Sequence, residues 1–203
     1  MNVIRTLWHE DTPDDDRRRA AMRAVCAPPV ALALAQLVGR SKKYPILINE
    51  GIVALTLLSL NSGAFAPLTV SLRLTILFYF IHIANVVLDA ITTPLPQEVS
   101  STTTAASSAA ESEIGSPMTA PGRAVDMLAY LLRGRGANVP EEVRANACVL
   151  LGQVGREGGV GAERVPEIVK LKAGLRPLLA GAAESDKESR LKTAATGALR
   201  RWG

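Results

Sequence analysis

Three successive parts of the chain share one internal design, and this repetition constrains the fold more than any other feature. Each part has a leucine-rich segment, then a polar turn, then a longer apolar segment with small residues at its centre. The pairs are PPVALALAQLV with YPILINEGIVALTLLSL, GRAVDMLAYLLRG with PEEVRANACVLLGQV, and KAGLRPLLAGA with KESRLKTAATGALRRW. Apolar residues spaced three and four positions apart indicate helices. We therefore expect a helical protein built from repeated units.

The length of the repeat indicates the kind of array. Asn146 and the matching Thr193 are 47 residues apart, at the upper edge of the armadillo and HEAT period. Each unit leaves an apolar face uncovered, so units should stack into a right-handed superhelix. Small residues are expected to let neighbouring helices approach closely, namely Ala54, Ala147, Gly152, Ala194, Ala195 and Gly197. The prediction is an all-α, armadillo/HEAT-type α-α superhelix of about three repeats. An irregular helical bundle is the alternative.

The composition agrees with a helical core. Hydrophobic residues make up 48% of the 203 residues and aromatic residues only 4%, whereas β-sandwiches favour aromatic and β-branched strands. The formal net charge is +4, and the basic residues are scattered rather than interleaved with aromatic residues. We therefore predict no nucleic-acid partner.

Turn residues and capping residues divide the chain. The expected helices are Val30 to Val38, Tyr44 to Leu60, Arg123 to Arg133, one that starts at Pro140, Val165 to Leu171, Gly174 to Ala183, and one from a capping box at 185–188 to Trp202. The predicted organisation is a first armadillo-like unit with an N-terminal helix at 1–67, a hydrophobic insertion at 68–97, a disordered Ser/Thr/Ala linker at 98–121, and two armadillo-like units at 122–203.

The hydrophobic insertion allows three interpretations. It could be an extra amphipathic or buried helix that covers the array. It could be a membrane segment, although its longest uncharged stretch, Leu74 to Leu88, has 15 residues and a span needs about 20. It could also be a retained intron at 70–97, because codons for Val-Ser, Ala-Asn and Pro-Gln there can resemble donor, branch and acceptor sites.

Residues for catalysis or metal binding do not gather in the sequence. The only cysteines are Cys26 and Cys148, and the only histidines are His9 and His82, with no metal-ligand spacing. The glycine-rich stretch at 155–161 lacks the Lys and Ser or Thr of a phosphate-binding loop. We predict a protein without enzymatic activity, cofactor or metal, in which Cys148 is an inert small hydrophobic residue.

Parts of the chain resemble a known family. KKYPILINEGIVALTLLSL, RAVDMLAYLLRG, PEEVRANACVLLGQVG and VPEIVKLKAGLRPLLAGAAESDKESRLKTAA look like the last armadillo repeats of the small-GTPase GDP-dissociation stimulator family (SmgGDS). The similarity covers roughly residues 17–60 and 123–199. Members of that family are longer arrays, so the resemblance implies that this chain is a C-terminal piece.

The resemblance also implies a function and a site. Family members are cytoplasmic chaperones or exchange factors for Rho- and Rap-type small GTPases, and they meet membranes only indirectly through a prenylated partner. Asn49 and Asn146 would occupy equivalent places and face a partner-binding groove, with Glu50 and Arg144 beside them. Alternatively, both Asn side chains satisfy neighbouring backbone carbonyls.

Other functions remain open at this point. One is a different armadillo adaptor, such as a UCS-type myosin chaperone, and another is a membrane-associated helical protein carried by residues 74–88. A truncated array could also associate with a second copy, because interior repeats need neighbours to bury their apolar faces.

Overall fold

The computed structural model describes residues 20–21, 24–60, 83–95, 122–133, 139–156, 162–184 and 189–203, and every regular element within these ranges is helical. The elements are α3 (Pro28–Arg40), α4 (Pro45–Leu60), α6 (Ala124–Leu132), α7 (Glu141–Val154), the short 3-10 helix η1 (Ala162–Arg164), α8 (Val165–Ala183) and α9 (Ser189–Arg201). A further helix occupies 83–92. The predicted all-α fold is confirmed. The linker at 98–121 and the capping box at 185–188 lie outside the described residues.

Proline and acidic residues explain where several helices begin. The first turn of α3 contains Pro28 and Pro29, and a proline at the first position loses no helical hydrogen bond. Pro140 directly precedes α7, whose first turn carries Glu141 and Glu142 beside the positive helix end. These starts lie within two residues of the predicted ones, because they depend on local chemistry alone.

The prediction of two short helices between residues 165 and 183 is wrong, because α8 is a single helix. The predicted break lay between Leu171 and Gly174, where the second helix was expected to begin. However, the buried residues Ile168, Leu175 and Leu179, with the half-buried Leu171 between them, form one continuous apolar stripe. Packing along this stripe outweighs a glycine penalty of about 1 kcal/mol.

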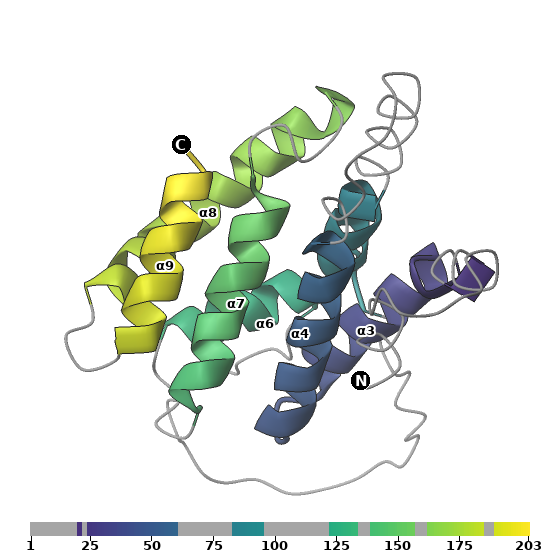
Figure 1. The fold of residues 1–203 in the computed structure, drawn as a ribbon, viewed down its shortest axis with the longest axis horizontal. Helices are drawn as coiled ribbons and strands as arrows, with labels where there is room; N and C mark the ends of the chain where they lie inside the picture. The colour runs from purple at the N-terminus through teal and green to yellow at the C-terminus, as the bar shows by residue number, and fades with distance from the viewer. Residues whose placement is uncertain are drawn as a thin grey trace, which may run out of the picture.

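The helices form two layers. Each of α3, α6 and α8 packs against the helix that follows it, namely α4, α7 and α9. In one layer α3 contacts α6 and α6 contacts α8, and in the other α4 contacts α7 and α7 contacts α9. Figure 1 shows α4, α7 and α9 side by side in front of the other layer. This connectivity is that of a helical repeat array, in which each pair mainly contacts its neighbours.

Small residues bring α7 and α9 close together, as the sequence predicted for Gly152. A Cβ atom added at Gly152 would lie 2.9 Å from the Cα of Ala198, so only glycine fits there without moving a backbone. Gly197 was also predicted to allow a close approach of helices, but a Cβ atom added there would have no other atom within 4 Å. Of the two glycines, Gly152 alone sets the spacing between α7 and α9.

The helix at 83–92 belongs to the same core as the repeats. Ile83, Val87, Leu88 and Ile91 are buried in the cluster that also contains the inner residues of α4, α6 and α7. The described part of the hydrophobic insertion is therefore a buried helix. The rest of 68–97 lies outside the described residues.

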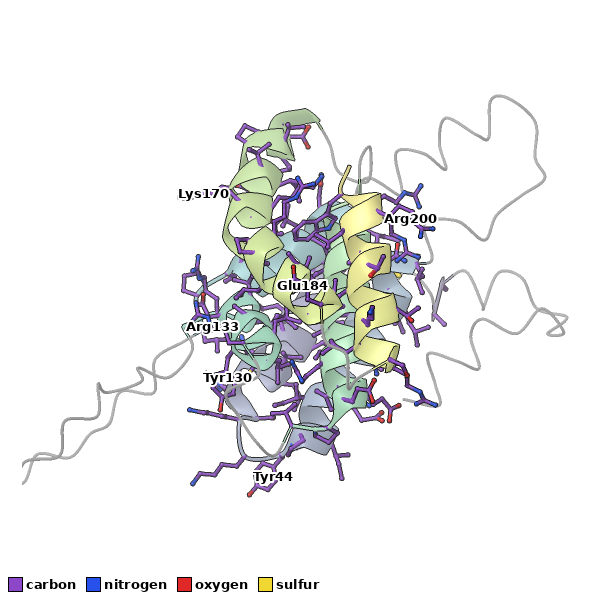
Figure 2. All side chains as sticks on the ribbon, turned by 90° about the vertical axis from the view of Figure 1, so that its left-hand side faces the viewer. Tyr44, Tyr130, Arg133, Lys170, Glu184 and Arg200 are labelled. Carbon is purple, nitrogen blue, oxygen red and sulfur yellow. The ribbon has the colours of Figure 1, made fainter. Side chains whose placement is uncertain are left out.

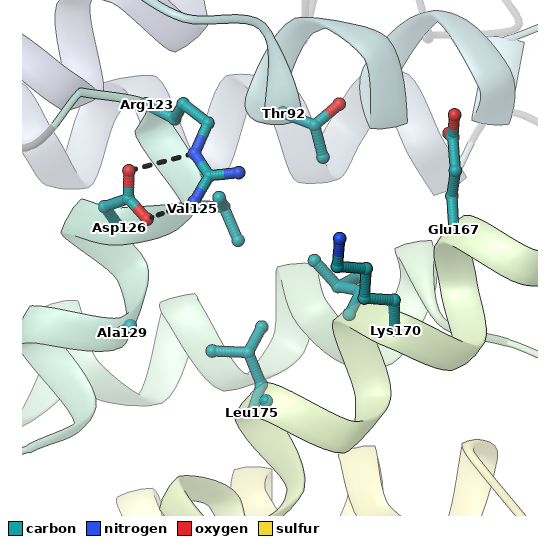
Figure 3. Close-up of a pocket in the computed structure, with 10 residues that line it drawn as sticks. Thr92, Arg123, Val125, Asp126, Ala129, Glu167, Lys170 and Leu175 are labelled. Carbon is teal, nitrogen blue, oxygen red and sulfur yellow. Dashed lines mark hydrogen bonds and ion pairs between the residues drawn. The ribbon is translucent and has the colours of Figure 1, made fainter.

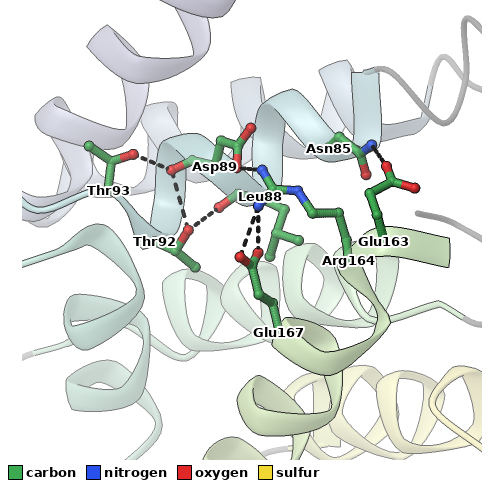
Figure 4. Close-up of polar contacts among 8 residues, drawn as sticks. All are labelled: Asn85, Leu88, Asp89, Thr92, Thr93, Glu163, Arg164 and Glu167. Atoms are coloured by element: carbon green, nitrogen blue, oxygen red, sulfur yellow. Dashed lines mark hydrogen bonds and ion pairs between the residues drawn. The ribbon is translucent and has the colours of Figure 1, made fainter. Parts of the chain in front are cut away.

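Polar contacts attach the helix at 83–92 to η1, directly before α8 (Figure 4). Asp89 pairs with Arg164, which also donates two hydrogen bonds to Glu167, at 2.8 and 2.9 Å. Asn85 Nδ2 donates to Glu163 Oε1 at 3.2 Å. Asp89, Glu163 and Glu167 are exposed, whereas Asn85 and Arg164 are half-buried. Ion pairs with an exposed partner contribute little on their own.

Within the ranges that the structure describes, no helix has both the length and the apolar character that a membrane crossing requires.

The first turn of α9 receives its cap from a different unit. Glu141 Oε1, at the start of α7, accepts hydrogen bonds from the backbone N–H groups of Arg190 and Leu191, at 2.7 and 3.1 Å. The first N–H groups of a helix have no partner within it, so a carboxylate there satisfies two of them. The sequence indicated only that Glu141 favours the start of its own helix.

We expect Glu141→Ala to lower the free energy of unfolding by about 1 kcal/mol, the usual cost of losing a helix cap. Glu142→Ala is the matched control, because Glu142 is also in the first turn of α7 but is exposed. Urea unfolding of both variants separates the cap on α9 from the charge effect on α7. Equal losses in the two variants would contradict the role of Glu141 as a cap.

Candidate functional site

The side chains of α4 and α7 that the fold leaves accessible form two neighbouring rows. We call these rows the α4–α7 face; all of their members are exposed or half-buried: Ile46, Asn49, Glu50, Val53, Leu57 and Leu60 on α4, and Glu142, Asn146, Val149 and Gln153 on α7. On α4, Gly51 turns away from this face and approaches Val38 of α3. The face therefore lies on the side of the layer of α4, α7 and α9 that α3 and α6 do not cover.

The two predicted groove residues meet directly. Asn146 Nδ2 donates a hydrogen bond to Asn49 Oδ1 at 2.8 Å, and both side chains are half-buried. The bond joins α7 to α4 across the boundary between two units. It differs from the expected alternative in which each amide pairs with a backbone carbonyl.

Asn49 and Asn146 do not occupy equivalent places, contrary to the prediction. The buried residues align Gly51 with Ala147 and Ala195, Ala54 with Leu150 and Ala198, and Leu58 with Val154 and Trp202. In that register Asn146 matches Glu50 and Ala194. Residues at equivalent positions on packed helices have backbones about 8–10 Å apart. Asn49 lies one residue before the position that matches Asn146, and its side chain is turned toward α7, so the two amides meet.

The amide pair retains hydrogen-bonding capacity. A primary amide has two donor hydrogens and an oxygen with two lone pairs, and the Asn49–Asn146 bond uses one of each. Within the described part of the chain, Asn49 Nδ2 and Asn146 Oδ1 make no other hydrogen bond. The pair therefore offers a donor and an acceptor side by side on the accessible face of the array.

Arg144 lies elsewhere. Its Nε donates to the backbone carbonyl of Leu131, near the end of α6, at 3.2 Å. A cation beside the last carbonyls of a helix is favourable because that end carries negative partial charge. Arg144 thus faces α6 and is not beside Asn146 as expected. Glu50, in contrast, lies on the α4–α7 face and is half-buried.

The structure gives Cys148 the character of a core residue. Its side chain is fully buried, and desolvation raises the pKa of the thiol to about 12, while the nearby charge of Arg144 acts in the opposite direction. In the described ranges, His, Cys, Asp and Glu side chains do not gather in groups of three that could hold a metal ion.

We expect Cys148 to resist alkylation at pH 8 in the native protein and to react in urea, because only the thiolate is nucleophilic. The raised pKa also sets a direction for stability. The thiol has a pKa of 9.0 in the unfolded chain and of about 12 in the folded chain. The free energy of unfolding therefore falls as the pH rises through that range. Mass spectrometry of the labelled peptide checks the first point. Labelling of native Cys148 at the rate of a free thiol would contradict its burial.

A cavity that the sequence did not indicate lies on the other layer, between α6, α8 and the helix at 83–92 (Figure 3). Its volume is about 520 Å³. Arg123 and Lys170 contribute positive charge, and Asp126 and Glu167 contribute an equal negative charge. Arg123 donates to both carboxylate oxygens of Asp126, at 2.9 and 3.1 Å, and this bond raises the pKa of Arg123. The charges of these four side chains sum to zero, and both carboxylates already pair with an arginine, Asp126 with Arg123 and Glu167 with Arg164.

Comparison of the chain with known proteins gave no match to a family model, to a curated protein or to a solved structure.

Proposed function

We propose that the chain is an armadillo-type interaction protein that binds another protein through the α4–α7 face. The observation that carries this proposal is the half-buried pair of Asn49 and Asn146, which holds a donor and an acceptor in place on an accessible surface. An exposed amide keeps its hydrogen bonds with water, whereas a paired and partly buried one is already oriented for a partner.

Helical residues that precede two of the helix pairs support the armadillo type. HEAT units have two helices and armadillo units have three. The helix at 83–92 precedes α6 and α7, and η1 precedes α8 and α9. In this assignment residues 83–92 are the first helix of the second unit, rather than an insertion outside it. That assignment disfavours a retained intron for these residues.

We further propose that the partner is a small GTPase of the Rho or Rap type, with the chain acting as a chaperone or as a stimulator of nucleotide dissociation. The similarity of the repeats to the SmgGDS family is the basis for this choice. The α4–α7 face contributes amides, Glu50 and apolar side chains, a mixture that suits a protein surface better than a small charged ligand.

We expect the double variant Asn49→Ala/Asn146→Ala to bind the GTPase at least tenfold more weakly. One lost hydrogen bond that leaves a buried partner group unpaired costs about 1–3 kcal/mol. Because both amides of the pair are removed together, the free energy of unfolding should fall by less than about 1 kcal/mol. Calorimetric titration with nucleotide-free and GDP-bound GTPases measures the affinity, and urea unfolding measures the stability.

Lys170→Ala on the opposite layer is the control and should leave the affinity unchanged. Intact affinity in the double variant, together with a large loss of stability, would make the amide pair structural. Absence of binding to any Rho- or Rap-type GTPase by the wild-type chain would reject the proposed partner.

A further inference from the structure

Among the described residues, four of the six exposed large hydrophobic side chains lie on or directly before α4, and the other two, Val165 and Val169, lie on α8. Ile46 is 77% exposed, Leu47 is 42% exposed and Leu60 is 45% exposed, and Tyr44 directly before the helix is 62% exposed. Figure 2 shows Tyr44 pointing outward from the edge of the fold. Isolated exposed hydrophobic residues are common, but a group of them on one element indicates an interaction surface.

The spacing on α4 indicates the shape of what would cover it. Ile46, Glu50, Val53, Leu57 and Leu60 alternate four and three residues apart along the exposed and half-buried side of the helix. This spacing places side chains in one line along a helix, which is the arrangement of a seam between two helices. From Ile46 to Leu60 the seam is about 21 Å long.

Glu50 indicates the charge of the covering helix. It is the charged member of an otherwise apolar row, and it is half-buried before anything covers it. A helix laid along the row would remove Glu50 from water, and a buried carboxylate is tolerated only when a cation pairs with it. The covering helix therefore needs a Lys or Arg opposite Glu50.

A second copy of the chain meets this need poorly. If two α4 helices paired along the whole row, Glu50 would face another Glu50 or one of the apolar members, Val53 and Leu57. Either arrangement leaves a carboxylate in the seam without a cation. The row thus fits a different protein better than itself.

We infer that α4 binds an amphipathic helix of a partner protein, with the partner's apolar seam on Ile46, Val53 and Leu60 and a basic side chain opposite Glu50. This inference rests on the proposed function, since it specifies what the partner presents to the α4–α7 face. It adds a partner element, its orientation along α4 and the charge that selects it.

Two designed peptides test the inference against the full chain. Both are amphipathic helices with Leu at the seam positions, and they differ only at the central seam position, which is Lys in one and Glu in the other. Fluorescence anisotropy gives the affinity of each. We expect the Lys peptide to bind the wild-type chain at least tenfold more tightly than the Glu peptide, and Glu50→Lys to reverse this preference.

Matched apolar variants locate the binding row. Ile46→Asp should weaken the Lys peptide at least tenfold, and it should not affect folding because Ile46 is largely exposed. Val169→Asp on α8 is the control, since Val169 is 59% exposed on the other layer. Circular dichroism confirms that both variants are folded. Equal effects of the two variants, or no reversal by Glu50→Lys, would overturn the inference.

The outcomes separate this inference from the identity of the partner. Peptide selection by Glu50 without GTPase binding supports the seam and rejects the GTPase. GTPase binding that is insensitive to Ile46→Asp and Glu50→Lys supports the proposed function and overturns the seam. A wild-type dimer in sedimentation velocity that Ile46→Asp dissociates would place a second copy on the row and also overturn the inference.

Discussion

Replacing Trp202 by Ala is expected to lower the free energy of unfolding by about 3–5 kcal/mol, the usual range for truncating a buried aromatic side chain. Trp202 is only 4% exposed, although it follows the last turn of α9. Its Nε1 donates to the backbone carbonyl of Leu151 in α7 at 2.9 Å. The ring therefore joins the last helix to the preceding unit.

Gly155 makes room for this ring. A Cβ atom at Gly155 would lie 2.3 Å from Trp202 Nε1, so the residue after α7 has to be small. Trp202→Phe keeps an aromatic ring but loses the hydrogen bond, and we expect it to lose about 1–2 kcal/mol. Urea unfolding followed by circular dichroism measures both variants. A loss below about 1 kcal/mol for Trp202→Ala would show that α9 is held mainly by other contacts.

Gly152→Ala is expected to lower the free energy of unfolding by about 1–3 kcal/mol, because the added methyl group overpacks a tight helix contact. The new carbon would meet the Cα and Cβ atoms of Ala198, at 2.9 and 3.0 Å, and a backbone atom cannot rotate out of the way. α9 would have to move away from α7.

The same substitution at Gly197 should have the opposite sign. Nothing lies within 4 Å of its Cβ position, so Gly197→Ala should raise the free energy of unfolding by about 0.5–1 kcal/mol through the lower backbone entropy of the unfolded chain. The two variants have identical chemistry in neighbouring helices. Stabilisation in both would mean that α7 and α9 are less closely packed than the structure indicates.

Local chemistry explains which parts of the fold were predictable. The predicted bounds of α3, α4 and α6 and the predicted start of α7 lie within two residues of the observed ones, because they follow from proline, turn and acidic residues within a few positions. The continuity of α8 was missed because it depends on one apolar stripe that packs against other helices. A glycine in the sequence does not reveal how much packing opposes it.

The contacts of the candidate site needed three-dimensional information. The sequence identified Asn49 and Asn146, but their mutual hydrogen bond depends on a register one residue away from the predicted alignment. A shift of one residue turns a helical side chain by about 100°. With the predicted alignment the two amides would lie in a row along one face, whereas with the observed one they bond to each other across α4 and α7. Arg144 was misplaced for a different reason: it lies two residues before Asn146, about 200° around the same helix, and its side chain turns toward α6.

Trp202 and Glu141 act across units that are far apart in the sequence. Trp202 bonds to a carbonyl 51 residues earlier, and Glu141 caps a helix about one repeat later. One sequence signal could have pointed to Trp202, since it has the same place in its helix as the buried residues Leu58 and Val154. No local signal predicted the second role of Glu141.

The backbone N–H of Leu95 donates to the carbonyl of Gly122 at 2.7 Å, so the chain leaves the helix at 83–92 and re-enters at α6 almost at the same point. The residues between these two anchors have no distance to bridge. The entropy of closing a loop grows only with the logarithm of its length, and doubling that length costs about 0.6 kcal/mol. A stretch of sequence can therefore be gained or lost at this junction with the two layers of helices left in register.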